Sequence, residues 1–196
     1  MRRFVLVALL VVSCSPTEET APPSTTTSTT QSTTTTTTIA STTTTERRPF
    51  GVSSPSFEHG ASIPRDHTCD GADVAPELDI VGVPASTQSL AIVVDDPDAP
   101  LGTWDHWVEF NIKSEANFLD VQKDSDPIGT QGLNSWHLTG YRGPCPPEDE
   151  DHEYRFTVYA LDATVDLPSG VESGPLYSAM EGHILTSDVL TGTYSR

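Results

Sequence analysis

Apolar and polar residues alternate with a period of two along much of the second half of the chain. Residues 89–94 are a near-continuous apolar run, which is typical of a strand buried on both faces. Residues 106–112 and 152–161 alternate instead, so every second side chain shares one face. These faces carry His106, Val108, Phe110 and Ile112 in the first segment, and His152, Tyr154, Phe156, Val158 and Ala160 in the second. Proline and glycine separate the segments, so the pattern predicts a mainly β fold, an antiparallel β-sandwich.

One later segment has a helical period. Ser173-Gly174-Pro175 is typical of a helix start, with Ser173 as a candidate N-cap and a proline in the first turn. Gly192 is a typical stop. Between them, apolar residues recur four apart and others widen the stripe: Leu176, Met180 and Ile184, with Leu185 and Val189. We therefore expect a helix that begins at Ser173 and continues past Val189.

The start of the chain resembles a bacterial export signal. Arg2-Arg3 are followed by apolar residues 4–12, a run too short to cross a bilayer as a helix, and Val11-Val12-Ser13-Cys14 resembles a lipobox. We expect residues 1–13 to be a lipoprotein signal peptide and Cys14 to carry the lipid. The protein would then be an extracytoplasmic, cell-envelope lipoprotein that meets the membrane through its lipid anchor only. The alternative is an ordinary cleaved signal with an incidental cysteine.

Composition divides the rest of the chain in two. Between Ser24 and Thr45, 15 of 22 residues are threonine and 4 are serine, so the segment has almost no apolar surface to bury. We expect residues 14–48 to be a disordered Thr/Ser-rich linker and residues 49–196 to form one domain. The net charge of −18 excludes nucleic-acid binding, which needs a basic surface, and opposes flat docking on anionic lipid.

Two histidines mark the candidate binding site. His106 and His152 each begin an alternating strand on its apolar face, directly after a polar or rigid loop. Asp96 and Asp98 could orient or protonate an imidazole, Tyr154 offers a hydroxyl, and backbone N–H groups near Gly143 could complete an anion nest. The set predicts a pocket for a phosphate, sulfate or carboxylate, in which protonated histidine favours binding. The alternative is two histidines that cap a core.

Catalytic and metal sites are less well supported by the sequence. Asp96, Asp98, His106 and His152 are plausible metal ligands, but no metal-binding motif spaces them. Ser135 lacks a nucleophile-elbow motif, and a Cys145–His152 pair requires a free thiol. Cys69 and Cys145 form an even pair in an exported domain, which favours a disulfide over two buried free thiols. We expect no catalytic residue, metal or cofactor.

Five motifs in order resemble the phosphatidylethanolamine-binding protein family, in its bacterial branch. Raf kinase inhibitor proteins are eukaryotic relatives. The motifs are Thr68-Cys69-Asp70-Gly71, DPDAP at 96–100 with GTWxHW at 102–107, GYRGPCPP at 140–147, HxYxFxxYAL at 152–161, and AMEGHIL at 179–185 with Gly192-Thr193-Tyr194. The resemblance covers residues 50–196.

The resemblance implies a Greek-key β-sandwich with a peripheral C-terminal helix. It also implies a small anion pocket formed by Asp96, Asp98, His106, Gly143, Pro147, His152 and Tyr154, and it places Cys69 and Cys145 on one side of the domain. We expect a non-enzymatic protein that binds a small phosphate- or carboxylate-containing ligand or a phospholipid head group. The alternatives are a protease or kinase inhibitor acting on a protein partner and, third, a hydrolase or metal-dependent enzyme.

This chain departs from the family pattern at the rim of that pocket. Residues 148–151 are all acidic where the family usually has glycine and histidine, and Glu153 replaces a basic residue. Like charges repel, so we expect weak binding of simple anions or a preference for zwitterionic ligands.

Overall fold

A computed structural model describes residues 48–113, 118–119 and 127–196 of the chain. The predicted signal peptide at 1–13, the lipidated Cys14 and almost all of the linker at 14–48 lie outside the described residues. Within the described part, no helix is long and apolar enough to cross a membrane.

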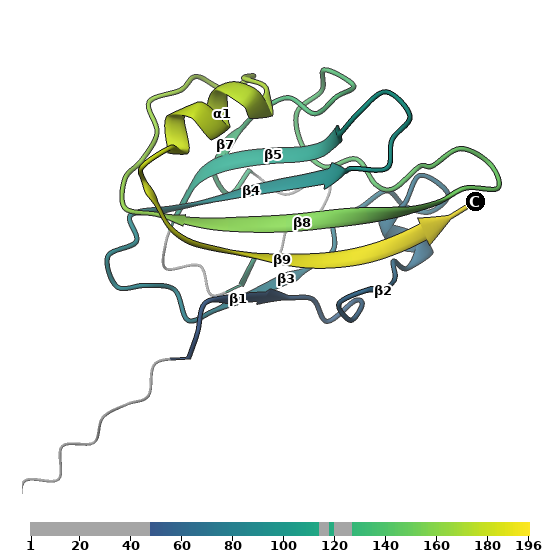
Figure 1. Ribbon diagram of the computed structural model, residues 1–196, viewed down its shortest axis with the longest axis horizontal. Helices are drawn as coiled ribbons and strands as arrows, with labels where there is room; N and C mark the ends of the chain where they lie inside the picture. Colours follow the sequence, from purple (N-terminus) through teal and green to yellow (C-terminus); the bar gives the residue numbers. More distant parts are fainter. Residues whose placement is uncertain (1–47, 114–117, 120–126) are drawn as a thin grey trace, which may run out of the picture. The chain divides into compact units, whose positions relative to one another are not determined.

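Two sheets form the domain (Figure 1). The larger sheet has the strand order β2-β9-β8-β4-β5-β7, and the smaller has the order β1-β3-β6. All pairs are antiparallel except β2–β9, which is parallel. The larger sheet contains β2 (Ala61–Ser62), β4 (Ser89–Asp96), β5 (Trp104–Lys113), β7 (Thr130–Gln131), β8 (Asp151–Leu161) and β9 (Ile184–Ser195); the smaller contains β1 (Gly51–Ser53), β3 (Leu78–Val81) and β6 (Phe118–Leu119); a 3-10 turn, η1, spans Arg65–His67.

The predicted mainly β fold is confirmed, and its two best strands are where the pattern placed them. Every residue of β4 is buried, because apolar layers cover both of its faces. One layer joins β4 and β8 to β3, and the other joins β4 and β5 to the helix α1 (Ser173–Met180). His152, Tyr154, Phe156, Val158 and Ala160 of β8 are all buried, as the alternation predicted. The Greek-key connection stays a prediction.

The helix predicted from Ser173 past Val189 is wrong beyond Met180. Gly182 has a φ of 81°, which breaks the helix, and residues 184–195 form β9 instead. Eleven residues of β8 pair with β9, so the ladder of backbone hydrogen bonds outweighs a four-residue spacing of apolar side chains. Glu172, not Ser173, is the N-cap, and the hydroxyl of Ser173 donates to Asp105 Oδ2 at 2.5 Å.

The strand at 106–112 does not alternate along its whole length. Near Asn111, two steps along β4 match three along β5, and Asn111 has a φ of 55°. This bulge turns Ile112 onto the face opposite to Val108 and Phe110. The prediction that the three share one face is therefore wrong for Ile112.

Candidate functional site

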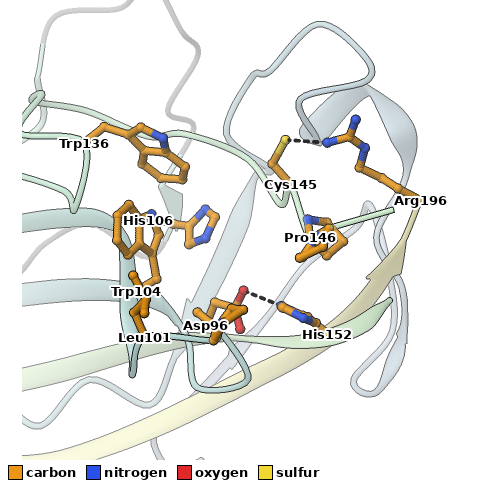
Figure 2. Close-up of a pocket in the computed structure, with 12 residues that line it drawn as sticks. Asp96, Leu101, Trp104, His106, Trp136, Cys145, Pro146, His152 and Arg196 are labelled. Carbon is orange, nitrogen blue, oxygen red and sulfur yellow. Dashed lines mark hydrogen bonds and ion pairs between the residues drawn. The ribbon is translucent and has the colours of Figure 1, made fainter. Parts of the chain in front are cut away.

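A pocket of about 430 Å³ opens where β4 ends and β5 and β8 begin (Figure 2). Four of the residues predicted for the site line it: Asp96, His106, Pro147 and His152. Asp98, Gly143 and Tyr154, the other three, lie outside this lining. The structure thus brings the two histidines to one pocket, at its two sides.

The turn after β4 supplies the carboxylates of the site. Asp96 Oδ1 accepts the backbone N–H of Asp98 at 2.9 Å, which tightens the turn. Asp98 Oδ2 accepts the backbone N–H of Glu153 at 2.9 Å and so ties the turn to β8. Asp98 therefore positions the turn, whereas the buried Asp96 faces the pocket.

His152 lies between two carboxylates. Its Nδ1 is 2.8 Å from Asp96 Oδ2, and its Nε2 is 3.1 Å from Glu150 Oε2. A carboxylate only accepts hydrogen bonds, so both contacts are made at once by the imidazolium form. Burial lowers the pKa of His152, but its hydrogen bonds to the carboxylates of Asp96 and Glu150 outweigh burial and raise the pKa above its ordinary value of 6.5.

His106, in contrast, is neutral. Its Nδ1 is 2.7 Å from the carbonyl oxygen of Arg142, so Nδ1 carries a proton. Burial lowers the pKa of His106, and this effect exceeds the opposing effect of the Arg142 carbonyl. The ring is therefore neutral at neutral pH, with Nε2 unprotonated and able to accept a hydrogen bond.

A bulge aims His106 into the pocket. Val94 pairs with Trp107, but Asp95 pairs with Asp105, so His106 is an extra residue in β5. Its ring packs edge-on against Tyr154, at 5.2 Å between centroids, on the face of the first core layer. The prediction that His106 shares a face with Val108 and Phe110 is therefore wrong, because the bulge reverses the alternation.

Tyr154 lies behind the pocket wall, between the two histidine rings. Its ring centroid is 5.2 Å from that of His106 and 6.5 Å from that of His152. The side chain is fully buried, and its hydroxyl makes no hydrogen bond of good geometry among the described residues, although Asp96 and the backbone of Cys145 lie close to it. Burial raises the pKa of Tyr154, so the hydroxyl stays protonated at neutral pH and can donate a hydrogen bond.

Gly143 holds the loop before β8 close to the segment around η1. Its N–H donates to Asp73 Oδ1 at 2.7 Å, so this group is already engaged. A side chain at this position would collide with the carbonyl oxygen of His67, which explains the glycine. The predicted nest of free N–H groups is thus occupied at Gly143 by a carboxylate of the chain.

The predicted disulfide between Cys69 and Cys145 is confirmed, with 5.5 Å between their Cα atoms. Cys145 lines the pocket, so the bridge ties one wall to the loop after η1. With this thiol bonded, a Cys145–His152 nucleophile cannot form.

The other catalytic and metal candidates have no suitable surroundings in the described part of the chain. The hydroxyl of Ser135 accepts the backbone N–H of Asp105 at 2.8 Å, and Ser135 lines a separate hollow. Among the described residues, no group of three or more His, Cys, Asp or Glu side chains is arranged to hold a metal ion.

Sequence reasoning missed the aromatic and cationic parts of the wall. Trp104 and Trp136 line the pocket with their ring centroids 5.4 Å apart, and Leu101 at the mouth is 93% exposed. Arg196 lines the opposite side (Figure 2). Trp104 stands two residues before His106, which was an available signal. Arg196 is distant in sequence and reaches the site only through the pairing of β9 with β8.

Comparison with known proteins assigns the chain to a family. The sequence model of the phosphatidylethanolamine-binding protein family matches residues 53–195. The chain belongs to this family. A UPF0098 protein of Chlamydia pneumoniae is 40% identical over 148 residues, which are 73% of this chain and 97% of the relative. A UPF0098 protein of Methanothermobacter thermautotrophicus is 43% identical over 145 residues, 72% of this chain and 95% of the relative.

Two solved structures of the family share the fold. The homologue CT736 from Chlamydia trachomatis superposes with a TM-score of 0.71 at 36% identity, covering 75% of this chain and 97% of that one. YbcL from E. coli has a TM-score of 0.70 at 30% identity, covering 75% of this chain and 98% of that one. The resemblance inferred from the motifs is therefore confirmed. The residues that match the family model lie within the predicted domain at 49–196.

Proposed function

We propose that this protein is a non-enzymatic binding protein, anchored to the cell envelope through Cys14, whose pocket holds a small zwitterionic ligand such as a phospholipid head group. The observation that carries the proposal is the buried Asp96–His152 ion pair at the side of an open pocket. A buried ion pair costs desolvation energy, so placing one at a pocket wall favours a role toward a charged ligand over a role in stability.

The two sides of the pocket suit the two charges of such a ligand. Asp96 offers a carboxylate to an ammonium group, His106 Nε2 offers it an acceptor, and the aromatic rings of Trp104 and Trp136 line the same wall. Arg196 offers a guanidinium to a phosphate or carboxylate. The family name refers to a lipid whose head group carries both charges, which supports the same ligand class.

Calorimetric titration of residues 49–196 with phosphoethanolamine, inorganic phosphate and ethanolamine tests the pocket. Phosphoethanolamine should bind more tightly than either half alone, and Asp96→Asn should weaken it. Asp95→Asn is the matched control, because Asp95 pairs with Arg155 and does not line the pocket. Absence of binding by the wild-type domain would contradict the proposal.

Membrane fractionation tests the anchor separately. The Cys14→Ser variant of the full chain should leave the membrane fraction, while its ligand binding stays unchanged. Retention of this variant in the membrane fraction would contradict lipid anchoring and leave the pocket proposal intact.

A second candidate function is inhibition of a protease or kinase by protein contact. It is favoured by exposed apolar side chains in the pocket lining, where Leu101 and Trp136 are 93% and 37% exposed. Leu101→Ser should abolish such inhibition in an enzyme assay. The same variant should leave head-group binding almost unchanged, because Leu101 stands at the mouth.

A further inference from the structure

The pocket has two cationic side chains along its described lining, His152 and Arg196. His106, the third candidate, is neutral for the reasons given above. An anion bound in the pocket therefore has two groups from which to take a charge-assisted hydrogen bond.

His152 has no N–H left for a ligand. Its Nδ1–H is directed at Asp96, and its Nε2–H is directed at Glu150. The side chain is only 5% exposed, and turning the ring toward the pocket would break its buried contact with Asp96. Its charge is neutralised by two adjacent carboxylates, which leaves little attraction for a third anion.

Arg196 is held in place but keeps unused donors. Its backbone carbonyl accepts the N–H of Asp149 at 2.9 Å, which fixes the chain at the end of β9. Its Nη1 donates to Cys145 Sγ at 3.3 Å, and sulfur is a weak acceptor. Its Nε forms an ion pair with Asp70 Oδ2 at 3.7 Å, too long for a hydrogen bond, and that oxygen already accepts the hydroxyl of Tyr194 at 2.8 Å.

The guanidinium also has suitable access and chemistry. Its side chain is 32% exposed, and Figure 2 shows it across the pocket from His106, Trp104 and Trp136. A guanidinium has five N–H groups in a planar fork that matches two oxygens of a phosphate or carboxylate. The sulfur contact is weak and the Asp70 ion pair is about one-third exposed on both sides, so water screens it and an anion can bind beside it at low cost.

We propose that Arg196, and not His152, is the residue that binds the anionic group of the ligand. His152 then acts as a positioning residue that holds the Asp96 carboxylate toward the pocket. This inference rests on the proposed function, because it assigns the anion-binding residue of that same pocket.

The test compares Arg196→Gln with Arg65→Gln by calorimetric titration of phosphoethanolamine, inorganic phosphate and ethanolamine. Arg65 is the matched control, since its Nε donates to the Asp70 carbonyl at 2.8 Å on the same loop and its side chain does not line the pocket. Arg196→Gln should weaken the binding of phosphoethanolamine and phosphate about tenfold or more and leave the binding of ethanolamine unchanged. Arg65→Gln should bind all three as the wild type does.

Arg196→Lys guards against a folding defect, because it keeps the charge and the aliphatic stem and removes the fork. It should keep the wild-type melting temperature and recover only part of the phosphate affinity. Equal phosphate affinity of the wild type and Arg196→Gln overturns the inference and leaves the proposed function standing. Equal weakening by Arg65→Gln overturns it too, because net charge would then explain the effect. No binding by the wild type overturns both.

Discussion

The two walls of the pocket differ in charge although each is built around a histidine. On the β5 side, His106 contacts a backbone carbonyl and aromatic rings, and it is neutral. On the β8 side, His152 contacts two carboxylates and is an imidazolium. Both rings are buried, so burial alone does not decide the charge. The difference teaches that the partner atoms, delivered by loops distant in sequence, set the role of each histidine.

The largest change should follow loss of the disulfide, which ties the pocket-lining loop at Cys145 to the loop after η1. Cys69→Ser/Cys145→Ser opens a closed loop with a sequence separation of 76 residues. The chain-entropy model predicts a loss of about 4 kcal/mol in the free energy of unfolding. Denaturant unfolding measures it, with Cys14→Ser as the control that should not change the stability of the domain. A loss below about 1 kcal/mol would contradict the tether.

Removing the Asp96 carboxylate should be the next largest effect. Asp96→Asn leaves the buried His152 with one partner that is 52% exposed, and breaking a buried pair costs about 3 kcal/mol. The control Asp95→Asn removes a carboxylate from Arg155, whose side chain is 40% exposed, and should cost about 1 kcal/mol. Urea unfolding at neutral pH compares the two. If Asp95→Asn lowers the free energy of unfolding more than Asp96→Asn does, the Asp96–His152 pair is not the stronger of the two.

The pH dependence of stability should separate the histidines by sign. The pKa of His152 is raised on folding, so its contribution is complete below its unfolded value near 6.5 and is lost as pH rises through the raised pKa. The pKa of His106 is lowered, so the folded state loses stability as pH falls below about 6.5. His152→Gln should flatten the alkaline side of the profile and His106→Gln the acidic side. Exchanged effects would reverse the assignment.

The smallest effect should come from Glu150→Gln. Because the Glu150 side chain is 52% exposed, water screens the pair, and the free energy of unfolding should fall by less than about 1 kcal/mol. The pKa of His152 should also fall, since one of the two carboxylates that raise it is gone. Proton NMR titration of His152 measures this directly. An unchanged pKa would mean that Asp96 alone sets the charge of the ring.

Much of the fold could be predicted from the sequence because strands buried on one or both faces leave a period of two or a continuous apolar run. The buried β4 and the alternating β8 were predicted in this way. The bulges at His106 and Asn111 were not, because an extra residue in a strand changes the pairing without changing composition. The helix was predicted too long because residues 184–189 satisfy a helical spacing by chance and pair with β8 instead.

The sequence predicted which residues form the site better than it predicted the hydrogen bonds between them. The chemistry of Asp96, His106 and His152 identified one pocket, and the family motifs added Pro147. Which nitrogen faces which oxygen depends on Glu150 and on the carbonyl of Arg142, and no sequence pattern encodes those contacts. Arg196 reaches the pocket only through the register of β9, a long-range pairing that the helix prediction excluded.

Nitrogen-15 NMR of the imidazole rings at neutral pH, without ligand and with phosphoethanolamine, tests the central claim most directly. We predict that His152 has both nitrogens protonated and His106 only Nδ1. Ligand should shift the Arg196 Nε resonance and leave the protonation of His152 unchanged. A neutral His152, or a His106 that becomes doubly protonated as phosphate binds, would contradict the division of the pocket into a neutral wall and a charged wall.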